Sequence, residues 1–315
     1  MTDTIAAVVV TYNRKQLLAE CLDALLNQTR PVQKIIVIDN ASSDGTPEFL
    51  RENGYLDNAT TEYVRLPENT GGAGGFYEGV KRGQEAGYDW LWLMDDDAEP
   101  ELDAVEILAR YFNQENVVAL ANLKIGRDGI PQYGHSGWLD LCFQANSAVK
   151  SITEHDLKKE IVVVDFSSFV GILLKTSALY KAGLPRKDFF IHHDDIEYCY
   201  RLKQHGRLLL LPQSRIIHKD QRKSTNTMRT FLRRRSLRIP YDKLWIDYYG
   251  YRNMAWLKKR YCSSGLAILL SAHVRKMVGI LLYDDHKYRR IRFYSNALYD
   301  GLVGRFDNNR PKQLL

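Results

Sequence analysis

Cysteines are few in this sequence, and none are closely spaced. The 315 residues contain four, at the scattered positions Cys21, Cys142, Cys199 and Cys262. Zinc sites need closely spaced ligands and disulfide frameworks need dense cysteines, so we expect neither. Unpaired cysteines are typical of a reducing compartment.

Long apolar runs are also scarce. Ile5 to Val10 is too short for the hydrophobic segment of a signal peptide, and Asp3 stands where a positive charge would precede one. The best candidate for a membrane span, Leu266 to Tyr283, is interrupted by one histidine and two basic residues, so we do not expect it to cross a membrane. These absences predict a soluble or peripheral protein in the cytoplasm.

Two nucleotide-binding signatures and all repeats are missing as well. No Gly-x-Gly-x-x-Gly follows the first expected strand, which disfavours a nicotinamide-dependent oxidoreductase, and no Gly-Lys-Ser/Thr marks a P-loop. With 45% hydrophobic and 26% charged residues, the composition is that of a globular protein with one large or two smaller domains.

Charge is unevenly distributed along the chain. Residues 212–315 hold 23 Lys+Arg and 7 Asp+Glu, a net charge of +16, whereas residues 1–211 hold 21 and 31, a net charge of −10. A basic module is thus joined to an acidic body. Such a module favours anionic partners, which are acidic lipid head groups, nucleic acid or polyphosphates.

Four short apolar runs alternate with helical patterns in the acidic body. Runs of this length, rich in branched or aromatic side chains, indicate buried strands. A repeated order of strand, polar loop and helix predicts a doubly wound sheet. The expected strands are Ala6–Val10, Lys34–Ile38, Tyr63–Leu66 and Trp90–Met94.

Each of these strands ends in polar or glycine-rich residues. The carboxyl ends of parallel strands meet at one edge of a sheet, where ligands bind, so we expect these residues to gather there. Carboxylates and amides can recognise a base and a ribose, and glycine lets the backbone approach a phosphate. The residues concerned are Thr11, Arg14, Asp39, Asn40, Asn69, Gly72 and the triplet Asp95, Asp96 and Asp97.

The acidic triplet has two interpretations. Adjacent carboxylates repel one another and are costly to desolvate, so a divalent metal among them would explain their position at the end of a buried strand. The alternative is a solvated acidic loop before a helix capped by Asp103. Singly, Asp39 and Asp44 are also typical of turns and helix caps.

Three motifs resemble family 2 glycosyltransferases of the GT-A fold: Val8 to Arg14, Ile38 to Thr46, and the aspartate triplet. Asn69 to Phe76 further resembles galactofuranosyltransferases and the related rhamnosyltransferases. The resemblance covers roughly residues 5–220. It implies an α/β GT-A (Rossmann-like) fold, a doubly wound mixed sheet with a helical, basic C-terminal region, and an inverting transfer from a nucleotide sugar.

The resemblance also implies a donor site. Arg14, Asp39 and Asn69 would hold the uridine of a UDP-sugar, and Asp96 would touch the sugar or ribose. The remaining donor residues would be Thr11, Asn40 and Gly72.

A metal site is implied in the same way. Asp95 and Asp97 match the metal-binding acids of the family, and His218 matches its histidine ligand, although a lone histidine is usually structural. Two carboxylates and an imidazole suit Mn²⁺ or Mg²⁺, with diphosphate oxygens in the remaining positions.

The reacting base is expected at a second acidic pair. An aromatic run leads into Asp194 and Asp195 at the start of a predicted helix, and one of the two is expected to cap it. Inverting transfer needs a carboxylate beside the acceptor hydroxyl, and the family position of that base matches Asp195. Asp194, His193 and Gly171 are expected on the acceptor side.

The basic tail is predicted to be helical, as a region from 223 to 315 separate from a catalytic domain of 1–222. Helical patterns cover Tyr241–Trp256, Leu266–Leu282 and Ile291–Val303, and the segment from Asn226 is included in the helical region. Basic residues beside Trp and Tyr suit an interfacial helix on an anionic membrane. An ordinary helical subdomain with a homo-oligomer contact explains them equally well.

The sequence thus predicts a metal-dependent galactofuranosyltransferase. Its donor would be UDP-galactofuranose, its acceptor a glycan or lipid-linked saccharide, and its product a surface polysaccharide such as lipopolysaccharide, made at the inner face of the cell membrane. A rhamnosyltransferase using dTDP-rhamnose is the near alternative. A nucleic-acid-binding protein would explain the basic tail but leave the acidic strand ends unexplained, so we expect no nucleic acid partner.

Overall fold

The computed structural model describes residues 3–142, 148–219 and 226–315, which form two compact units. The first consists of Met1–Leu139, Val149–Lys187 and Asp194–Asp220, and the second of Asp140–Ala148, Asp188–His193 and Gln221–Leu315. The domain boundary predicted after residue 222 lies outside the described residues. Two short segments, 140–148 and 188–193, belong to the second unit, which no sequence pattern indicates.

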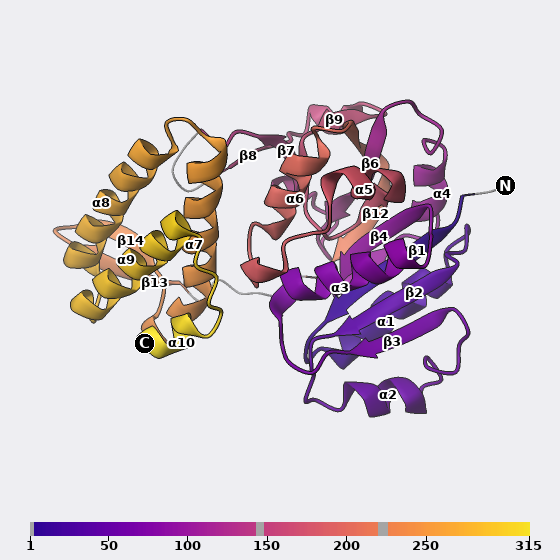
Figure 1. The fold of residues 1–315 in the computed structure, drawn as a ribbon, viewed down its shortest axis with the longest axis horizontal. Helices are drawn as coiled ribbons and strands as arrows, with labels where there is room; N and C mark the ends of the chain where they lie inside the picture. Colours follow the sequence, from indigo (N-terminus) through magenta and orange to yellow (C-terminus); the bar gives the residue numbers. More distant parts are fainter. Residues whose placement is uncertain (1–2, 143–147, 220–225) are drawn as a thin grey trace. The chain divides into compact units, whose positions relative to one another are not determined.

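The first unit contains a nine-stranded sheet that begins with four parallel strands in the order β3-β2-β1-β4 (Figure 1). These are β1 (Ile5–Thr11), β2 (Lys34–Asp39), β3 (Thr61–Arg65) and β4 (Trp90–Asp95). The predicted strands are therefore confirmed to within a few residues. The connecting helices are α1 (Lys15–Leu26), α2 (Thr46–Glu52) and α3 (Gly71–Glu85).

β1 is buried on both faces, as a strand between two helical layers must be. Ile5, Ala7 and Val9 lie in the hydrophobic core that also contains the apolar face of α1. Val8 and Val10 point to the other face, where α3 packs. The doubly wound arrangement thus follows from an unbroken run of apolar, mostly branched side chains.

Glycines allow α3 to approach this sheet closely. A Cβ atom at Gly75 would lie 2.5 Å from Val10 Cγ1, and one at Gly79 would lie 2.2 Å from Val8 Cγ1. Both distances are far too short for real atoms, so these positions require glycine. Gly72 differs, because a Cβ there would meet nothing within 4 Å. Part of the glycine-rich motif therefore serves packing, and part leaves the backbone open.

The second half of the sheet is mixed. β11 (Ile172–Lys175) runs antiparallel between β4 and β6 (Val117–Ile125). β12 (Arg207–His218) is parallel to β6 and antiparallel to β5 (Ala98–Pro100) and to β9 (Val162–Val164). The predicted GT-A fold class with a mixed sheet is confirmed.

β12 continues through Pro212, where its register with β6 shifts between Leu211 and Arg215. Proline is tolerated at such an irregularity because it cannot donate a ladder hydrogen bond. Beyond the shift, His218 pairs with Ala98 of β5. This register brings His218 beside the end of the acidic triplet.

Smaller elements complete the first unit. A three-stranded sheet contains β10 (Phe166–Ser167), β7 (Ser136–Leu139) and β8 (Val149–Ser151), in that order. The remaining α-helices are α4 (Ala104–Ala109), α5 (Thr176–Ala182) and α6 (Asp194–Leu202), and short 3₁₀ turns are η1 (Tyr133–His135), η2 (Asp156–Lys158) and η3 (Lys187–Phe189).

The second unit is mainly helical, as predicted (Figure 1). It contains η4 (Tyr241–Lys243), α7 (Leu244–Tyr261), α8 (Gly265–Tyr283), α9 (Lys287–Val303) and α10 (Arg310–Leu314). Among the described helices, α8 is long and apolar enough to cross a membrane by length and mean hydropathy, so its polar interruptions alone do not exclude a span. Only 17% of its apolar window is buried.

The segment after residue 226 is not helical, so that prediction is wrong. Strands β13 (Thr227–Phe231) and β14 (Arg234–Arg238) form an antiparallel hairpin around Leu232 and Arg233, which both have positive φ. Branched and aromatic side chains at Thr227, Thr230 and Phe231 favour extended backbone, a signal that the high arginine content obscured.

The expectation of four unpaired cysteines is also wrong. Cys142 and Cys262 form a disulfide within the second unit, across a sequence separation of 120 residues. Cys21 and Cys199 are free and buried. Sequence spacing could not reveal the pair, because only the fold of the second unit brings the two residues together.

Candidate active site

The acidic triplet follows β4 and meets the end of β1. Val10 pairs with Asp95 in the parallel ladder, so the residues that follow the two strands lie side by side. Thr11 Oγ1 donates to Asp96 Oδ2 at 2.6 Å. Arg14 Nη2 lies 2.5 Å from Asp96 Oδ1, and Arg14 Nη1 donates to Asp97 Oδ2 at 2.7 Å. The predicted convergence of these two strand ends is thus seen in the structure.

Burial dominates the electrostatics of this cluster. Asp96 is fully buried and Asp97 almost so. Burial raises the pKa of Asp96 to about 6, although the Arg14 charge and the Thr11 hydrogen bond oppose the increase. The three aspartates together raise the pKa of Arg14 despite its own desolvation. The single positive charge of Arg14 does not balance three aspartates, so a second cation would reduce the remaining repulsion between them.

His218 lies beside Asp97. Its Nε2 is 3.5 Å from Asp97 Oδ1, because β12 and β5 pair in the register described above. Gln132 Oε1 lies 2.7 Å from His218 Nδ1, and an amide oxygen can only accept, so Nδ1 donates. The Nε2 lone pair is then directed toward the acidic cluster.

These groups fit part of a divalent metal site. Asp97 Oδ1 is buried and accepts no hydrogen bond from the described residues, and the His218 Nε2 lone pair lies next to it. Oxygen and imidazole donors suit Mn²⁺ or Mg²⁺. Among the residues that the structure describes, however, no three His, Cys, Asp or Glu side chains are grouped tightly enough to hold an ion. Asp95 is not brought into such a group.

The ends of β2 and β3 are tied to this edge through Asn40. Its backbone N–H donates to Thr11 O at 3.0 Å, and its Nδ2 donates to Gly71 O at 3.2 Å. Asn69 Oδ1 accepts from Gly71 N at 2.8 Å. Gly72 follows directly, so the structure brings the predicted donor residues of three strand ends together.

Asp39 is buried within its own loop. It accepts from Ser42 N at 2.9 Å and from the Tyr63 hydroxyl. Its carboxylate also lies 3.9 Å from Arg65 Nε. Asp44 accepts from Thr46 Oγ1 at 2.5 Å at the start of α2. The turn role considered for these two residues is therefore present. The N-cap residue of α2 is Gly45, so Asp44 precedes the cap rather than forming it.

The second acidic pair begins α6. Asp195 Oδ1 accepts from Ile196 N at 2.7 Å. Burial raises the pKa of Asp195 to about 6, and burial together with the Asp195 charge raises the pKa of Asp194 further. The Asp95 charge also raises the pKa of Asp194, more weakly.

Lys124 was missed by the sequence analysis. It lies fully buried on β6, where Nζ donates to Ser167 Oγ at 2.5 Å and to Gly171 O at 3.4 Å. Burial lowers the pKa of Lys124 to about 7, and the Asp195 charge opposes this change. A lysine within the mostly apolar run Val117–Ile125, one residue before its end, was the available signal.

Gly171 is needed for packing as well as for its carbonyl group. Its φ is +78°, and a Cβ there would lie 2.2 Å from Ile216 Cδ1. His193 belongs to the second unit, where burial lowers its pKa to about 3, so it is neutral at physiological pH. The acceptor-side roles predicted for both residues remain predictions.

Comparison with known proteins agrees with this geometry. A family model described as glycosyl transferase family 2 matches residues 6–173, which is more than half of the chain. The chain belongs to glycosyl transferase family 2. The candidate residues on the first four strand ends lie within the matched region, whereas Asp195 and His218 follow it.

Named relatives include the galactofuranosyltransferase GlfT1 of two bacteria. The Mycolicibacterium smegmatis protein is 29% identical over 211 residues, which are 65% of this chain and 67% of that protein. The Mycobacterium tuberculosis protein is 32% identical over 209 residues, which are 65% of this chain and 66% of that protein. The match thus spans about two thirds of each relative.

Solved structures share the fold. GalNAc-T7 with UDP, GalNAc and Mn²⁺ superimposes with a TM-score of 0.63 at 14% identity, over 96% of this chain and 56% of that one.

The family match and the named relatives confirm the predicted resemblance to galactofuranosyltransferases and the assignment as a glycosyltransferase. The rhamnosyltransferase and nucleic-acid alternatives are not favoured.

Proposed function

We propose that this enzyme transfers galactofuranose from UDP-galactofuranose to a lipid-linked saccharide, with inversion, during synthesis of a surface polysaccharide. The observation that carries the proposal is the convergence of Arg14, Asp97 and His218 at one end of the sheet. The galactofuranosyltransferase relatives support the choice of sugar.

The donor would lie along the ends of β1, β2 and β3. The open backbone at Gly72 allows close approach, and Thr11, Asn40 and Asn69 are already joined by hydrogen bonds around Gly71. Uridine would contact this edge near Asp39, and Asp96 would face the ribose or sugar. Arg14, which contacts Asp96 and Asp97, would hold the same uridine nucleotide.

Mn²⁺ or Mg²⁺ would be held by Asp97 and His218, with Asp95 as a third candidate. GalNAc-T7 contains Mn²⁺ with UDP, which supports divalent metal use by a similar fold. When bound, such an ion neutralises the departing diphosphate as a Lewis acid.

Asp195 would act as the general base. Its pKa of about 6 leaves it ionised at pH 7 yet basic enough to receive a proton. As the acceptor oxygen forms its bond to the anomeric carbon, its proton passes to Asp195. The bond from that carbon to the diphosphate breaks on the opposite face, and UDP leaves with the electron pair. Lys124, in its protonated form, would supply positive charge near Asp195.

A lipid-linked acceptor would place the enzyme at the inner face of the cell membrane, as a peripheral protein. The basic, mainly helical second unit supports this location through its attraction to anionic lipid.

A sugar-nucleotide panel tests the proposal directly. Purified enzyme is incubated with UDP-galactofuranose, UDP-galactopyranose, UDP-GlcNAc and dTDP-rhamnose, with Mn²⁺ or with EDTA, and nucleotide release is measured. We expect turnover of UDP-galactofuranose that requires Mn²⁺. Failure to bind or hydrolyse any sugar nucleotide would refute the proposal, and preference for dTDP-rhamnose would move it to the rhamnosyltransferases.

A further inference from the structure

One side of α8 exposes a continuous apolar surface within the second unit. Val274 is 61% exposed, and its neighbours along the same side are similarly accessible. The spacing of these residues, mostly four apart, keeps them on one broad face of the helix. They are Leu266, Leu270, Val274, Val278, Leu281 and Leu282.

The opposite side of α8 is packed. Leu269 and Ile280 are buried, Tyr251 of α7 bonds to His273, and Lys276 pairs with Asp247 of α7 at 3.5 Å. A helix that crosses a bilayer alone would expose these polar groups to lipid, which is costly. With one side held by its neighbours, α8 is suited to lie along an interface.

The β13–β14 hairpin has two different faces. Cross-strand partners share a face, so Thr227, Arg229 and Phe231 lie with Arg238 on one side, and Met228 and Leu237 lie on the other. The first side packs on the end of α8, where the ring centroids of Phe231 and Tyr283 lie 6.1 Å apart in an edge-to-face arrangement. The second side is exposed, as is Leu232 at the turn, with 80% of its surface accessible.

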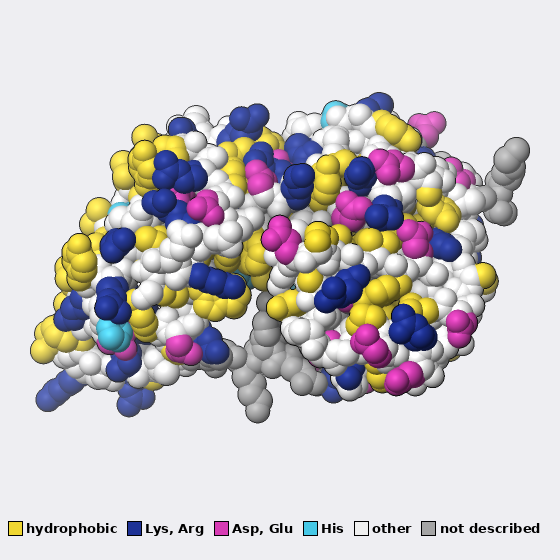
Figure 2. Space-filling view, turned by 60° about the horizontal axis from the view of Figure 1, so that its bottom comes forward, with side chains coloured by type: hydrophobic (Ala, Val, Ile, Leu, Met, Phe, Trp, Pro, Cys, Tyr) yellow, Lys and Arg dark blue, Asp and Glu magenta, His cyan; other side chains and the backbone are white. Residues whose placement is uncertain are grey.

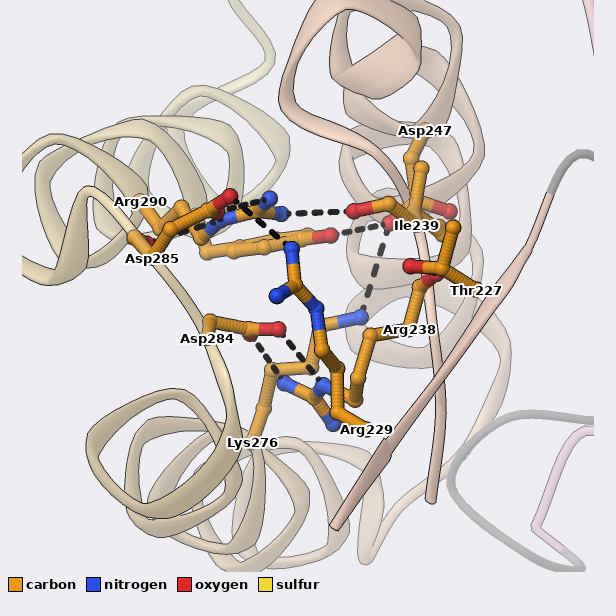
Figure 3. A network of polar contacts seen from close by, with 10 residues as sticks. Thr227, Arg229, Arg238, Ile239, Asp247, Lys276, Asp284, Asp285 and Arg290 are labelled. Carbon is orange, nitrogen blue, oxygen red and sulfur yellow. Dashed lines mark hydrogen bonds and ion pairs between the residues drawn. The ribbon is translucent and has the colours of Figure 1, made fainter.

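Ion pairs fasten the hairpin to the junction of α8 and α9. Figure 3 shows Arg238 directed at Asp284 and Arg229 at Asp285, with Nε–Oδ1 and Nη2–Oδ2 distances of 2.8 and 3.2 Å. Arg290 of α9 also binds Asp285, at 2.6 Å. The Arg238–Asp284 pair is largely buried, so the hairpin is joined to α8 as one structural block.

Charge on this block is almost entirely positive. The sequence has no Asp or Glu between residues 221 and 241 or between 248 and 283, and Asp284 and Asp285 are paired with arginines. Arg233, Arg235 and Arg275 are exposed beside the apolar side chains. Figure 2 shows yellow hydrophobic side chains with dark blue Lys and Arg among them on this unit, at the left of the picture.

We infer that α8 and the exposed side of the hairpin form one membrane-binding surface that recognises an anionic lipid bilayer. Apolar side chains enter the boundary between head groups and acyl chains, and the arginines pair with lipid phosphates. This inference deepens the proposed function, on which the membrane location rests, by assigning that location to named residues.

The combination of exposed apolar side chains and arginines favours an anionic bilayer over other partners. Nucleic acid would favour a polar, cationic face without a broad apolar stripe. A second copy of the chain would bring like charges together around the same stripe, which opposes association. An anionic bilayer offers both apolar depth and opposite charge.

Vesicle co-sedimentation of the full chain tests the surface. Vesicles of phosphatidylcholine alone are compared with vesicles that also contain phosphatidylglycerol. We expect binding to the second kind, which weakens as salt is raised. Leu270→Ser with Val274→Ser should weaken binding at least about tenfold, and Arg233→Gln with Arg235→Gln roughly tenfold.

Matched controls lie on the first unit. Leu102→Ser removes an apolar side chain that is 61% exposed, and Arg51→Gln removes an exposed charge, so neither should alter vesicle binding. Circular dichroism and the thermal midpoint confirm that each variant is folded. Wild-type protein that ignores anionic vesicles, or variants that bind like wild type, would overturn the inference, as would a concentration-dependent dimer that only the α8 variants disrupt.

Donor hydrolysis separates this inference from the proposed function. The α8 and hairpin variants should hydrolyse UDP-galactofuranose as wild type does. Protein that binds vesicles but turns over no sugar nucleotide would refute the function and leave the surface intact. Protein that turns over the donor but binds no vesicle would refute the membrane-binding surface and leave the proposed function intact.

Discussion

The two units of this protein differ in where their charged side chains gather. The first unit buries Asp96, Asp97, Lys124 and Asp194 at the ends of strands or the start of a helix. The second unit also buries a few charges, such as Arg252 and Asp300, but most of its described arginines are exposed. Buried charges are expensive and shift pKa values, which suits chemistry. Exposed charges cost little and act at a distance, which suits attraction to a partner.

Asp195→Asn tests whether the buried charges of the first unit take part in the reaction, and it should have the largest effect. We expect transfer to fall on the order of 10²–10⁴-fold with donor binding kept, because the base is lost. Since the folded state raises the pKa of Asp195 from 3.8 to about 6, its ionised form opposes folding at pH 7. That cost begins to fall near pH 6 and is gone only below about pH 4.

The same variant should therefore be more stable than wild type at pH 7, by about 1–3 kcal/mol. Transfer kinetics, donor titration and denaturant unfolding measure the three effects. Asp103→Asn, at an exposed carboxylate, serves as the control. Full transfer activity in Asp195→Asn would remove this residue from the reaction.

His218→Ala tests whether the buried cluster binds a metal. The half-saturating Mn²⁺ concentration for donor hydrolysis should rise roughly 10–100-fold, because an imidazole ligand is lost. His205→Ala, at an exposed histidine of the same unit, should leave the titration unchanged. If both variants titrate as wild type does, His218 is structural.

Asn253→Ala tests whether a buried polar side chain of the second unit only stabilises the fold or also affects the reaction. Asn253 Nδ2 donates to the carbonyl groups of Phe189, Ile191 and His192, at 2.9–3.1 Å. Three residues of that segment have positive φ, and it leads directly into Asp194. The variant should lose about 2–3 kcal/mol of stability.

Transfer by Asn253→Ala should fall more than donor binding, because the strained segment sets the start of α6. Urea unfolding and the separate kinetic constants provide the readouts. Asn27→Ala, at the exposed end of α1, is the matched control. Wild-type stability in Asn253→Ala would show that these three hydrogen bonds do not stabilise the fold.

Two glycine substitutions separate packing from binding within one motif. Gly79→Ala would clash with Val8 and should lower the free energy of unfolding by about 1–3 kcal/mol. Gly72→Ala meets open space, so its stability should change by less than about 0.5 kcal/mol, whereas its KM for donor should rise. Equal loss of stability in both would show that the whole motif is structural.

Lys124→Met should have the smallest effect, a shift of the pH profile. The Lys124 charge lowers the pKa of Asp195, so its removal should move the acidic limb of kcat/KM to higher pH by about one unit or less. Lys181→Met, at an exposed lysine, should not move it. An unmoved limb in Lys124→Met would mean that the two groups do not interact.

Much of the first unit could be predicted because its signals are local. Apolar runs indicated β1 to β4, and the parallel order of those strands implied that Thr11 and Arg14 would meet the acidic triplet. The second unit was predicted less well. Its hairpin was taken for a helix, because arginine-rich strands have no strong alternation of apolar and polar residues.

The sequence by itself determined the first four strands, the fold class and the family, since periodicity and short motifs depend only on neighbouring residues. Only the tertiary structure decided which distant groups meet. The register of β12 with β5 places His218 beside Asp97, β6 places Lys124 near Asp195, and the second unit joins Cys142 to Cys262. Such partners are set by strand register and helix packing, which no local pattern specifies.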